Sequence, residues 1–365
     1  MELIKIHTSD KESFVGYAES RIGGRVENQD SFSFAPTPYG FLVTVCDGMG
    51  GGPGGKTASS IAVTEIVKGV KEAEGGKQKP AEVVKAAVKQ ANAAIIAATE
   101  VNPELKGMGS TATVLLLNEE AAIVAHVGDS RVYQLRGKQK VFRTFDHSVV
   151  FDMVRQGIIT EEQARLSAQS NVITRALGVA PEVDVEIDVV PYESGDRFML
   201  CTDGIHGSMA EKELLKLIAD TRVALGPVAD NIATTVDEIG RREGGEHDNL
   251  TLALIQTKNN SKLKPKMSKR IKDILMVLGA VCVLSVVLNI WQCASSNSEP
   301  ADTKELENAI KAKDAQIQKL TDSVNVVNKA LVNKTDSLEQ LRKARSSALE
   351  ALGAGTTEQK TNNKK

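Results

Sequence analysis

The sequence predicts an α+β fold in which two antiparallel sheets are covered by helices. Short apolar runs bounded by glycine recur along the first part of the chain, and such runs are typical of buried strands. Several of these runs follow one another with no helical pattern between them, which indicates antiparallel neighbours. Two helical stretches stand side by side between strands, as expected for paired helices that pack on a sheet.

The strand pattern is clearest in the middle of the chain. Residues 114–117 and 121–127 are apolar runs on either side of Asn-Glu-Glu, which predicts a hairpin with a short turn. Residues 131–135 come directly after a Gly-Asp-Ser turn. We expect this third strand to continue the hairpin.

Helical periodicity marks the segments between the strands. Residues 55–73 and 80–98 are separated by Gly75-Gly76, and Pro80 fits the first turn of the second helix. Shorter helical patterns follow at residues 148–156, 160–168, 211–220 and 228–241.

Four aspartates, far apart in the chain, each stand at one end of an apolar run. They are Asp47 after residues 41–46, Asp129 after 123–128, Asp203 after 198–202, and Asp248 before 250–255. Strands that each carry a carboxylate at one end can bring these groups to a single point. Clustered carboxylates repel one another unless a cation neutralises them, and Mg²⁺ or Mn²⁺ suits an all-oxygen site.

Bulk composition places few limits on function. The chain has 365 residues, which fits one large domain with additional segments. A net charge of −2 and an aromatic content of 4% argue against a nucleic-acid partner. Cys46 and Cys201 lie in strand runs, so we expect them to be reduced and buried.

Beyond residue 258 the composition changes. Residues 259–272 form a basic linker, and residues 273–292 are almost wholly apolar. Residues 274–291 would span about 27 Å as a helix, close to the thickness of a bilayer core. We expect one transmembrane helix rather than a buried core helix, because no polar stripe interrupts the segment and Trp291 stands at its far end. The basic cluster before the helix would keep residues 1–272 in the cytoplasm, on the inner face of the cell inner membrane.

Residues 293–365 are expected to be extracytoplasmic. Apolar residues recur in them with alternating spacings of four and three, from Leu306 to Ala348. This heptad pattern predicts a coiled coil, which could form a homodimer, or a single amphipathic helix on a partner. The end of the segment, from residue 353, is expected to be disordered.

Seven motifs, in this order, give the chain a family resemblance. They are Gly24-Arg25-Val26-Glu27-Asn28-Gln29-Asp30-Ser31, Cys46-Asp47-Gly48-Met49-Gly50-Gly51, Gly109-Ser110-Thr111-Ala112, Val127-Gly128-Asp129-Ser130-Arg131, Asp146-His147-Ser148, Cys201-Thr202-Asp203-Gly204 and His247-Asp248-Asn249-Leu250-Thr251. Together they resemble the metal-dependent PP2C (PPM) family of protein serine/threonine phosphatases, in the form of its bacterial members. The resemblance covers about residues 13–257.

The resemblance implies a four-layer α/β/β/α sandwich with two Mn²⁺ or Mg²⁺ ions at one end of the sheets. The roles that it implies are Asp47 as a bridge between the ions, the Gly48 carbonyl on the second ion, Asp203 and Asp248 on the first, Asp129 at a third, weaker site, Arg25 on the substrate phosphate, and Asp30 acting through metal-bound water. Arginine suits this role because its planar fork matches phosphate oxygens.

Two positions depart from the family pattern. Gln29 stands where glutamate is common, so the second metal could bind more weakly or through water. Met49 stands where many eukaryotic members have a histidine that is proposed as a general acid. The leaving oxygen must then be protonated in another way, and metal-bound water is the expected source.

Three histidines near the motifs are interpreted as structural. His147 is expected to stabilise its turn by a hydrogen bond rather than to bind a metal. His126 and His206 lack a second nitrogen or sulfur ligand at useful spacing, so both are expected to be packing residues. The glycine run at residues 50–55 is interpreted as a turn before the next helix, and residues 151–171 as a variable flap beside the active site.

The sequence therefore predicts a membrane-anchored phosphatase that acts on phosphoserine and phosphothreonine in proteins. Two other functions stay open. One is a catalytically silent scaffold that binds phosphoproteins, which only Gln29 favours. The other is a phosphatase for small phosphoesters, because the motifs do not name the substrate.

Overall fold

The computed structural model describes residues 3–6, 13–50, 54–75, 78–264, 284–288, 291, 313, 315 and 318. The chain divides into two compact units, Met1–Lys266 and Met267–Lys365. The predicted membrane helix (273–292) and coiled coil (293–365) lie, apart from a few residues, outside the described residues. Over the described part of the chain, no helix is both long and apolar enough to cross a membrane.

The first unit contains two large sheets and a small one, and every pair of neighbouring strands is antiparallel. The six-stranded sheet runs in the order β1 (Ile4–Lys5), β2 (Phe14–Arg21), β13 (Leu250–Thr257), β12 (Arg197–Cys201), β9 (Arg131–Arg136) and β10 (Gln139–Arg143). The five-stranded sheet runs in the order β11 (Glu186–Val190), β8 (Ala122–Val127), β7 (Ala112–Leu117), β4 (Gly40–Cys46) and β3 (Ser31–Thr37). The small sheet pairs β5 (Gly48–Met49) with β6 (Gly109–Ser110).

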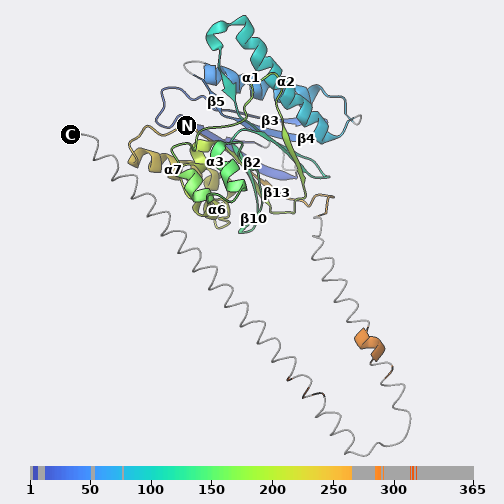
Figure 1. Ribbon diagram of the computed structural model, residues 1–365. Helices are drawn as coiled ribbons and strands as arrows, with labels where there is room; N and C mark the ends of the chain where they lie inside the picture. The colour runs from blue at the N-terminus through green and yellow to red at the C-terminus, as the bar shows by residue number, and fades with distance from the viewer. Residues whose placement is uncertain are drawn as a thin grey trace, which may run out of the picture. The chain divides into compact units, whose positions relative to one another are not determined.

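Helices cover the outer face of each large sheet, as Figure 1 shows. The long helices α1 (Gly54–Glu72) and α2 (Pro80–Val101) pack on the five-stranded sheet through one apolar cluster, which includes Ile66, Val88 and Leu116. Helices α5 (Asp203–His206), α6 (Glu211–Ile218) and α7 (Leu225–Arg242) pack on the six-stranded sheet through another. The first unit also contains the 3-10 turn η1 (Pro103–Leu105), α3 (Val149–Arg155) and α4 (Glu161–Arg165).

A third apolar cluster lies between the two sheets. It joins residues such as Val43 and Val124 of the five-stranded sheet to Phe198 and Ile255 of the six-stranded sheet. Each strand therefore turns alternate side chains toward the helices and toward the opposite sheet. The predicted α/β/β/α sandwich is confirmed.

The structure confirms some local predictions from the sequence and contradicts another. The hairpin is confirmed as β7 and β8, and Cys46 and Cys201 are buried free thiols as expected. The prediction that residues 131–135 continue this hairpin is wrong. Strand β9 pairs with β10 and β12, so the chain crosses from one sheet to the other at residues 128–130. Gly128 has φ +102°, and this left-handed conformation turns the chain away from the hairpin.

The chain leaves the last strand along the end of the sandwich that carries the β7–β8 turn. Lys258 donates its backbone N–H to Ser13, while Lys262 and Leu263 donate theirs to Glu119 and Glu120. The Lys262 ammonium also pairs with both glutamates, at 3.1 and 2.9 Å. Residues 258–263 are thus attached to the turn between β7 and β8.

Candidate functional site

A cavity of about 630 Å³ opens where strand ends from both sheets meet. Its wall contains Asp47 and Asp129 at the ends of β4 and β8, Asp203 after β12, and Asp248 before β13. The predicted convergence of these four carboxyl groups is confirmed. Arg25 and Gly48, the other residues expected to touch metal or phosphate, line the same cavity.

Thr111 holds Asp47 in place from the neighbouring strand. The Asp47 N–H donates to the Thr111 hydroxyl at 2.9 Å, and the Thr111 N–H donates to the Asp47 carbonyl at 2.8 Å. The same hydroxyl contacts the Ser130 hydroxyl at 2.7 Å. One threonine thus ties the Asp47 turn to the residue that follows Asp129. The motif containing Thr111 was recognised in the sequence, but its role was not, because its partners lie far away in the chain.

Asp203 and Asp248 are brought together by a close approach of two loops. Asp203 opens the four-residue helix α5, and Gly204 follows it. A Cβ atom on Gly204 would lie 2.0 Å from the Asn249 carbonyl oxygen. Only glycine therefore lets the end of β12 pack against the start of β13. Helix α5 is too short to give a periodic signal in the sequence.

Asn249 positions the loop that carries Arg25. Its side-chain amide donates to the carbonyls of Ile22 and Glu27, and its amide oxygen accepts the Gln29 N–H at 2.8 Å. The Arg25 guanidinium then reaches Asp248, with Nη2 2.8 Å from Oδ2. The Arg25 side chain is 52% exposed, so it stands at the cavity with room to meet a ligand from solvent.

Gly48 and Gly55 allow the backbone to approach this site closely. A Cβ atom on Gly48 would lie 2.0 Å from the Gly55 carbonyl oxygen. A Cβ atom on Gly55 would lie 2.7 Å from the Gln29 amide oxygen and 2.8 Å from the Gly48 carbonyl oxygen. The start of α1 thus fixes the carbonyl that was expected to bind the second metal.

The electrostatics of the cluster indicate a cation site. Burial raises the pKa of Asp47, Asp129 and Asp203 above the ordinary aspartate range, and negative neighbours raise it further. Oδ1 of Asp203 is buried and has no hydrogen-bond partner among the described residues. A buried oxygen without a partner is costly, so a bound cation would satisfy it. The donor set of carboxylates and one carbonyl fits Mg²⁺ or Mn²⁺.

Asp30 lies behind this cluster rather than in the cavity wall. It is 2% exposed, and Oδ2 accepts a hydrogen bond from the Thr202 hydroxyl at 3.0 Å. Burial, together with the charges of Asp203 and Asp248, raises the pKa of Asp30 to about 7. This position agrees with an action through water rather than direct contact with a metal.

The three histidines do not enter the cavity as metal ligands. His147 donates its N–H to the Gly128 carbonyl, and its Nδ1 accepts the Gly128 N–H, which confirms the predicted turn-stabilising role. His126 is buried between the sheets. His206 is also buried, and its Nε2 lies 3.0 Å from the Asp129 carbonyl. The sequence did not indicate that His206 supports the Asp129 backbone.

The predicted flap lies beside the cavity. Helices α3 and α4 form it, and the side chains of Ser148 and Thr160 cap their first turns. Asn171, at the end of this segment, lines the cavity. Met49 and Gln29 line it as well, so both departures from the family pattern stand at the site.

Residues 19–239 match the protein phosphatase 2C family. The chain belongs to this family. It is 32% identical over 236 residues to the serine/threonine phosphatase stp of Listeria monocytogenes, covering 64% of this chain and 88% of that protein. It is 30% identical over 240 residues to the protein phosphatase PhpP of Streptococcus pneumoniae, covering 63% of this chain and 92% of that protein.

Solved structures agree with this membership. The Mycobacterium tuberculosis serine/threonine phosphatase PstP/Ppp superposes with a TM-score of 0.56 at 30% identity, covering 67% of this chain and 99% of that one. The catalytic domain of PstP in complex with two manganese ions superposes with a TM-score of 0.57 at 28% identity, again covering 67% of this chain and 99% of that one. This protein phosphatase 2C family member is thus a protein serine/threonine phosphatase.

Proposed function

We propose that the cavity binds two Mn²⁺ or Mg²⁺ ions, with a third at a weaker site, and hydrolyses phosphoserine and phosphothreonine in proteins. The observation that carries the proposal is the convergence of Asp47, Asp129, Asp203 and Asp248 on one cavity. The unpartnered Asp203 oxygen and the raised pKa values of three of these carboxyl groups support it.

Each residue contributes a separate part of the site. Asp47 would bridge the two ions, Asp203 and Asp248 would hold the first, and the Gly48 carbonyl would hold the second. Asp129, in the turn that crosses between the sheets, would hold the third. Bound ions of this kind lower the pKa of water and shield the charge of a phosphate.

Arg25 and Asp30 would act on the substrate and on the proton. The Arg25 guanidinium offers two parallel donors to a phosphate, and its exposure leaves it accessible. Asp30 lies behind the cavity wall, hydrogen-bonded to the Thr202 hydroxyl, so it would exchange a proton with the site only through metal-bound water.

The activity is tested with the full-length protein in detergent and a phosphothreonine peptide. We expect phosphate release that requires Mn²⁺ and stops in excess EDTA. Asp203→Asn should abolish turnover, because it removes a negative ligand from the centre of the cluster. Turnover that persists undiminished in EDTA would refute the metal mechanism. Faster hydrolysis of a small phosphoester than of phosphopeptides would refute the assignment of a protein substrate.

We further propose that the phosphatase is anchored in the cell inner membrane by residues 273–292, with its catalytic unit in the cytoplasm. The apolar run and the basic linker before it support this topology. The full-length protein should sediment with membranes and resist extraction by high salt, and deletion of residues 273–292 should release it. Protease added outside the inner membrane should cleave the tail and leave residues 1–258 intact.

Residues 293–365 are proposed to pair as a coiled coil across the membrane from the catalytic unit. The detergent-purified protein should then have the mass of a dimer, whereas a chain truncated after residue 292 should have that of a monomer. The same number of chains per particle in the two proteins would contradict the pairing.

A further inference from the structure

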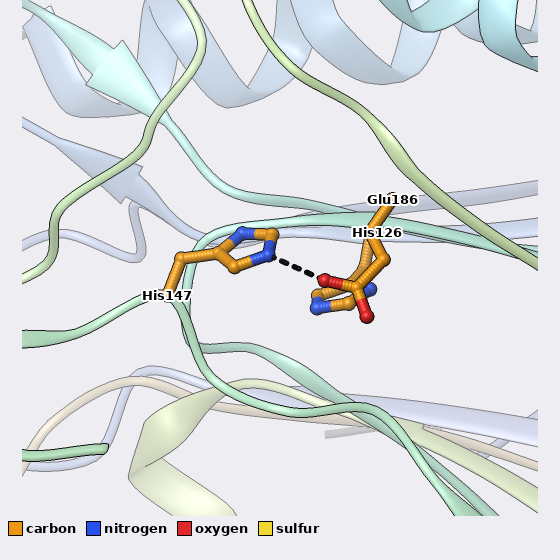
Figure 2. A group of neighbouring side chains, drawn as sticks. All are labelled: His126, His147 and Glu186. Carbon is orange, nitrogen blue, oxygen red and sulfur yellow. Dashed lines mark hydrogen bonds and ion pairs between the residues drawn. The ribbon is translucent and has the colours of Figure 1, made fainter. Parts of the chain in front are cut away.

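His126, His147 and Glu186 gather into one cluster, as Figure 2 shows. His126 belongs to β8, Glu186 lies opposite it on β11, and His147 follows β10. Their ligand atoms lie within 4.8 Å of one another, which suggests a metal site. Two features of the geometry argue against a metal there.

The first feature is the stacking of the two rings. The imidazoles of His126 and His147 lie 4.5 Å apart between centroids, with their planes 14° from parallel. A nitrogen lone pair lies in the plane of its ring, so lone pairs of stacked rings run alongside each other instead of meeting at one ion. Arg175 also brings a guanidinium nitrogen to 3.5 Å from His147 Nε2, where a cation would be repelled.

The second feature is the tautomer of His147, which its partners assign. Nδ1 accepts the Gly128 N–H at 3.1 Å, so it carries a lone pair. Burial lowers the pKa of His147 to about 4, which leaves the ring neutral with a single proton. That proton must lie on Nε2, which donates to Glu186 Oε2 at 3.1 Å. A metal on Nε2 would require the proton on Nδ1, where it would meet the Gly128 N–H.

The cluster instead stabilises the turn before Asp129 through hydrogen bonds to Gly128. His147 bonds both backbone polar groups of Gly128: its backbone N–H donates to the Gly128 carbonyl at 2.9 Å, and its ring accepts the Gly128 N–H. Gly128 has φ +102°, and a Cβ there would lie 2.6 Å from Thr111 Cγ2, so the turn is tightly constrained. The next residue is Asp129, at the point where the chain crosses between the sheets.

We propose that Glu186 and His147 form a positioning pair that sets Asp129 in the metal cavity. Glu186 keeps the proton on the outer nitrogen of the ring, which leaves the inner nitrogen free to hold the Gly128 amide. Glu186 also faces Arg155 of the flap helix α3, at 3.7 Å. One carboxylate therefore joins the flap to the Asp129 turn. This inference rests on the proposed function of the cavity.

Two matched substitutions of His147 test the pair. In His147→Asn the amide oxygen is bonded to Cγ, as Nδ1 is, so it can still accept the Gly128 N–H. In His147→Gln the amide stands at the Nε2 position and the acceptor is lost. The full-length protein is assayed for Mn²⁺ binding by calorimetry and for the Mn²⁺ concentration that gives half-maximal peptide hydrolysis.

We expect His147→Gln to raise that Mn²⁺ concentration about tenfold, on the scale of one lost bond to a buried amide. For His147→Asn, this Mn²⁺ concentration should stay within about threefold of that of the unmutated protein. If Mn²⁺ binding is weakened equally in the two variants, the ring only fills space, and the proposal is overturned. Zinc binding to the unmutated protein that is lost in His126→Ala would overturn it in favour of a metal cluster.

Glu186 supplies a second test, because its side chain is 37% exposed and tolerates change more readily. Glu186→Gln keeps an acceptor for the His147 proton, whereas Glu186→Met removes it. We expect Glu186→Met alone to weaken Mn²⁺ binding, with the melting temperature of the metal-free protein unchanged. If His147→Gln shows no cooperative unfolding and is therefore not folded, the two Glu186 variants test the positioning pair in its place. Absence of Mn²⁺ binding by the unmutated protein would refute the proposed function itself, whereas identical behaviour of both Glu186 variants would refute only the positioning pair.

Discussion

Replacing Asp30 by asparagine should stabilise the metal-free protein at neutral pH. The pKa of Asp30 is raised from 3.8 to about 7, a difference of about 3 pKa units, which corresponds to about 4 kcal/mol. A raised carboxyl pKa means that the folded state holds its proton more tightly than the unfolded state. Stability from this group is therefore fully present below pH 3.8 and is lost as the pH rises to about 7. Asparagine has no such proton to lose.

The assay is urea unfolding in EDTA of a chain ending at Lys266, where the first compact unit ends. The difference in unfolding free energy between Asp30→Asn and the unmutated protein should grow by about 4 kcal/mol between pH 4 and pH 7.5 in favour of the variant. Comparing the two proteins cancels the titrating groups that lie far from Asp30. Asp152→Asn, at an exposed position on α3, is the matched control for the replacement of a carboxyl group by an amide. A constant difference for Asp30→Asn would refute the reasoning that burial and clustered charge raise its pKa.

Three further predictions concern the cavity. Arg25→Met should raise the KM for a phosphopeptide at least about tenfold and leave Mn²⁺ binding as tight or tighter, because it frees Asp248 from an ion pair; weaker Mn²⁺ binding by calorimetry would contradict this. Gly48→Ala should abolish Mn²⁺ binding, since its Cβ would lie 2.0 Å from the Gly55 carbonyl oxygen; calorimetry with unchanged affinity would show that the carbonyl is not a ligand. Thr111→Val should lower kcat about tenfold while Thr111→Ser restores it, because only the hydroxyl accepts the neighbouring aspartate N–H; equal rates for the two variants would refute that role.

The convergence of the aspartates could be predicted because strand ends carry a strong local signal. Each apolar run is bounded by a turn, and a carboxylate at that boundary must lie at an edge of a sheet. The structure confirms that Asp47, Asp129, Asp203 and Asp248 share one cavity. The same logic failed at the strand after Gly128. A Gly-Asp-Ser turn can close a hairpin or lead to the opposite sheet, and the choice depends on packing that is absent from local sequence.

The residues that support the site were harder to find. Thr111 and Asn249 act through hydrogen bonds to backbone groups 64 and 220 residues away. Such partners become neighbours only when the sheets form, so no local spacing reveals them. The fold and the candidate ligands are therefore accessible from pattern, whereas the positioning of those ligands depends on long-range contacts. The membrane helix and coiled coil stay predictions.

The attachment of residues 258–263 has a mechanical consequence for the enzyme. Their anchor, the turn at Glu119 and Glu120, closes the far end of the hairpin whose near end carries Thr111 and Asp129. A strand of six residues separates the two ends by about 20 Å. Residues 258–263 thus leave the first unit at the end of the sandwich opposite the four aspartates. Residues 258–263 do not line the cavity, so a bulky phosphorylated protein can reach it without passing them.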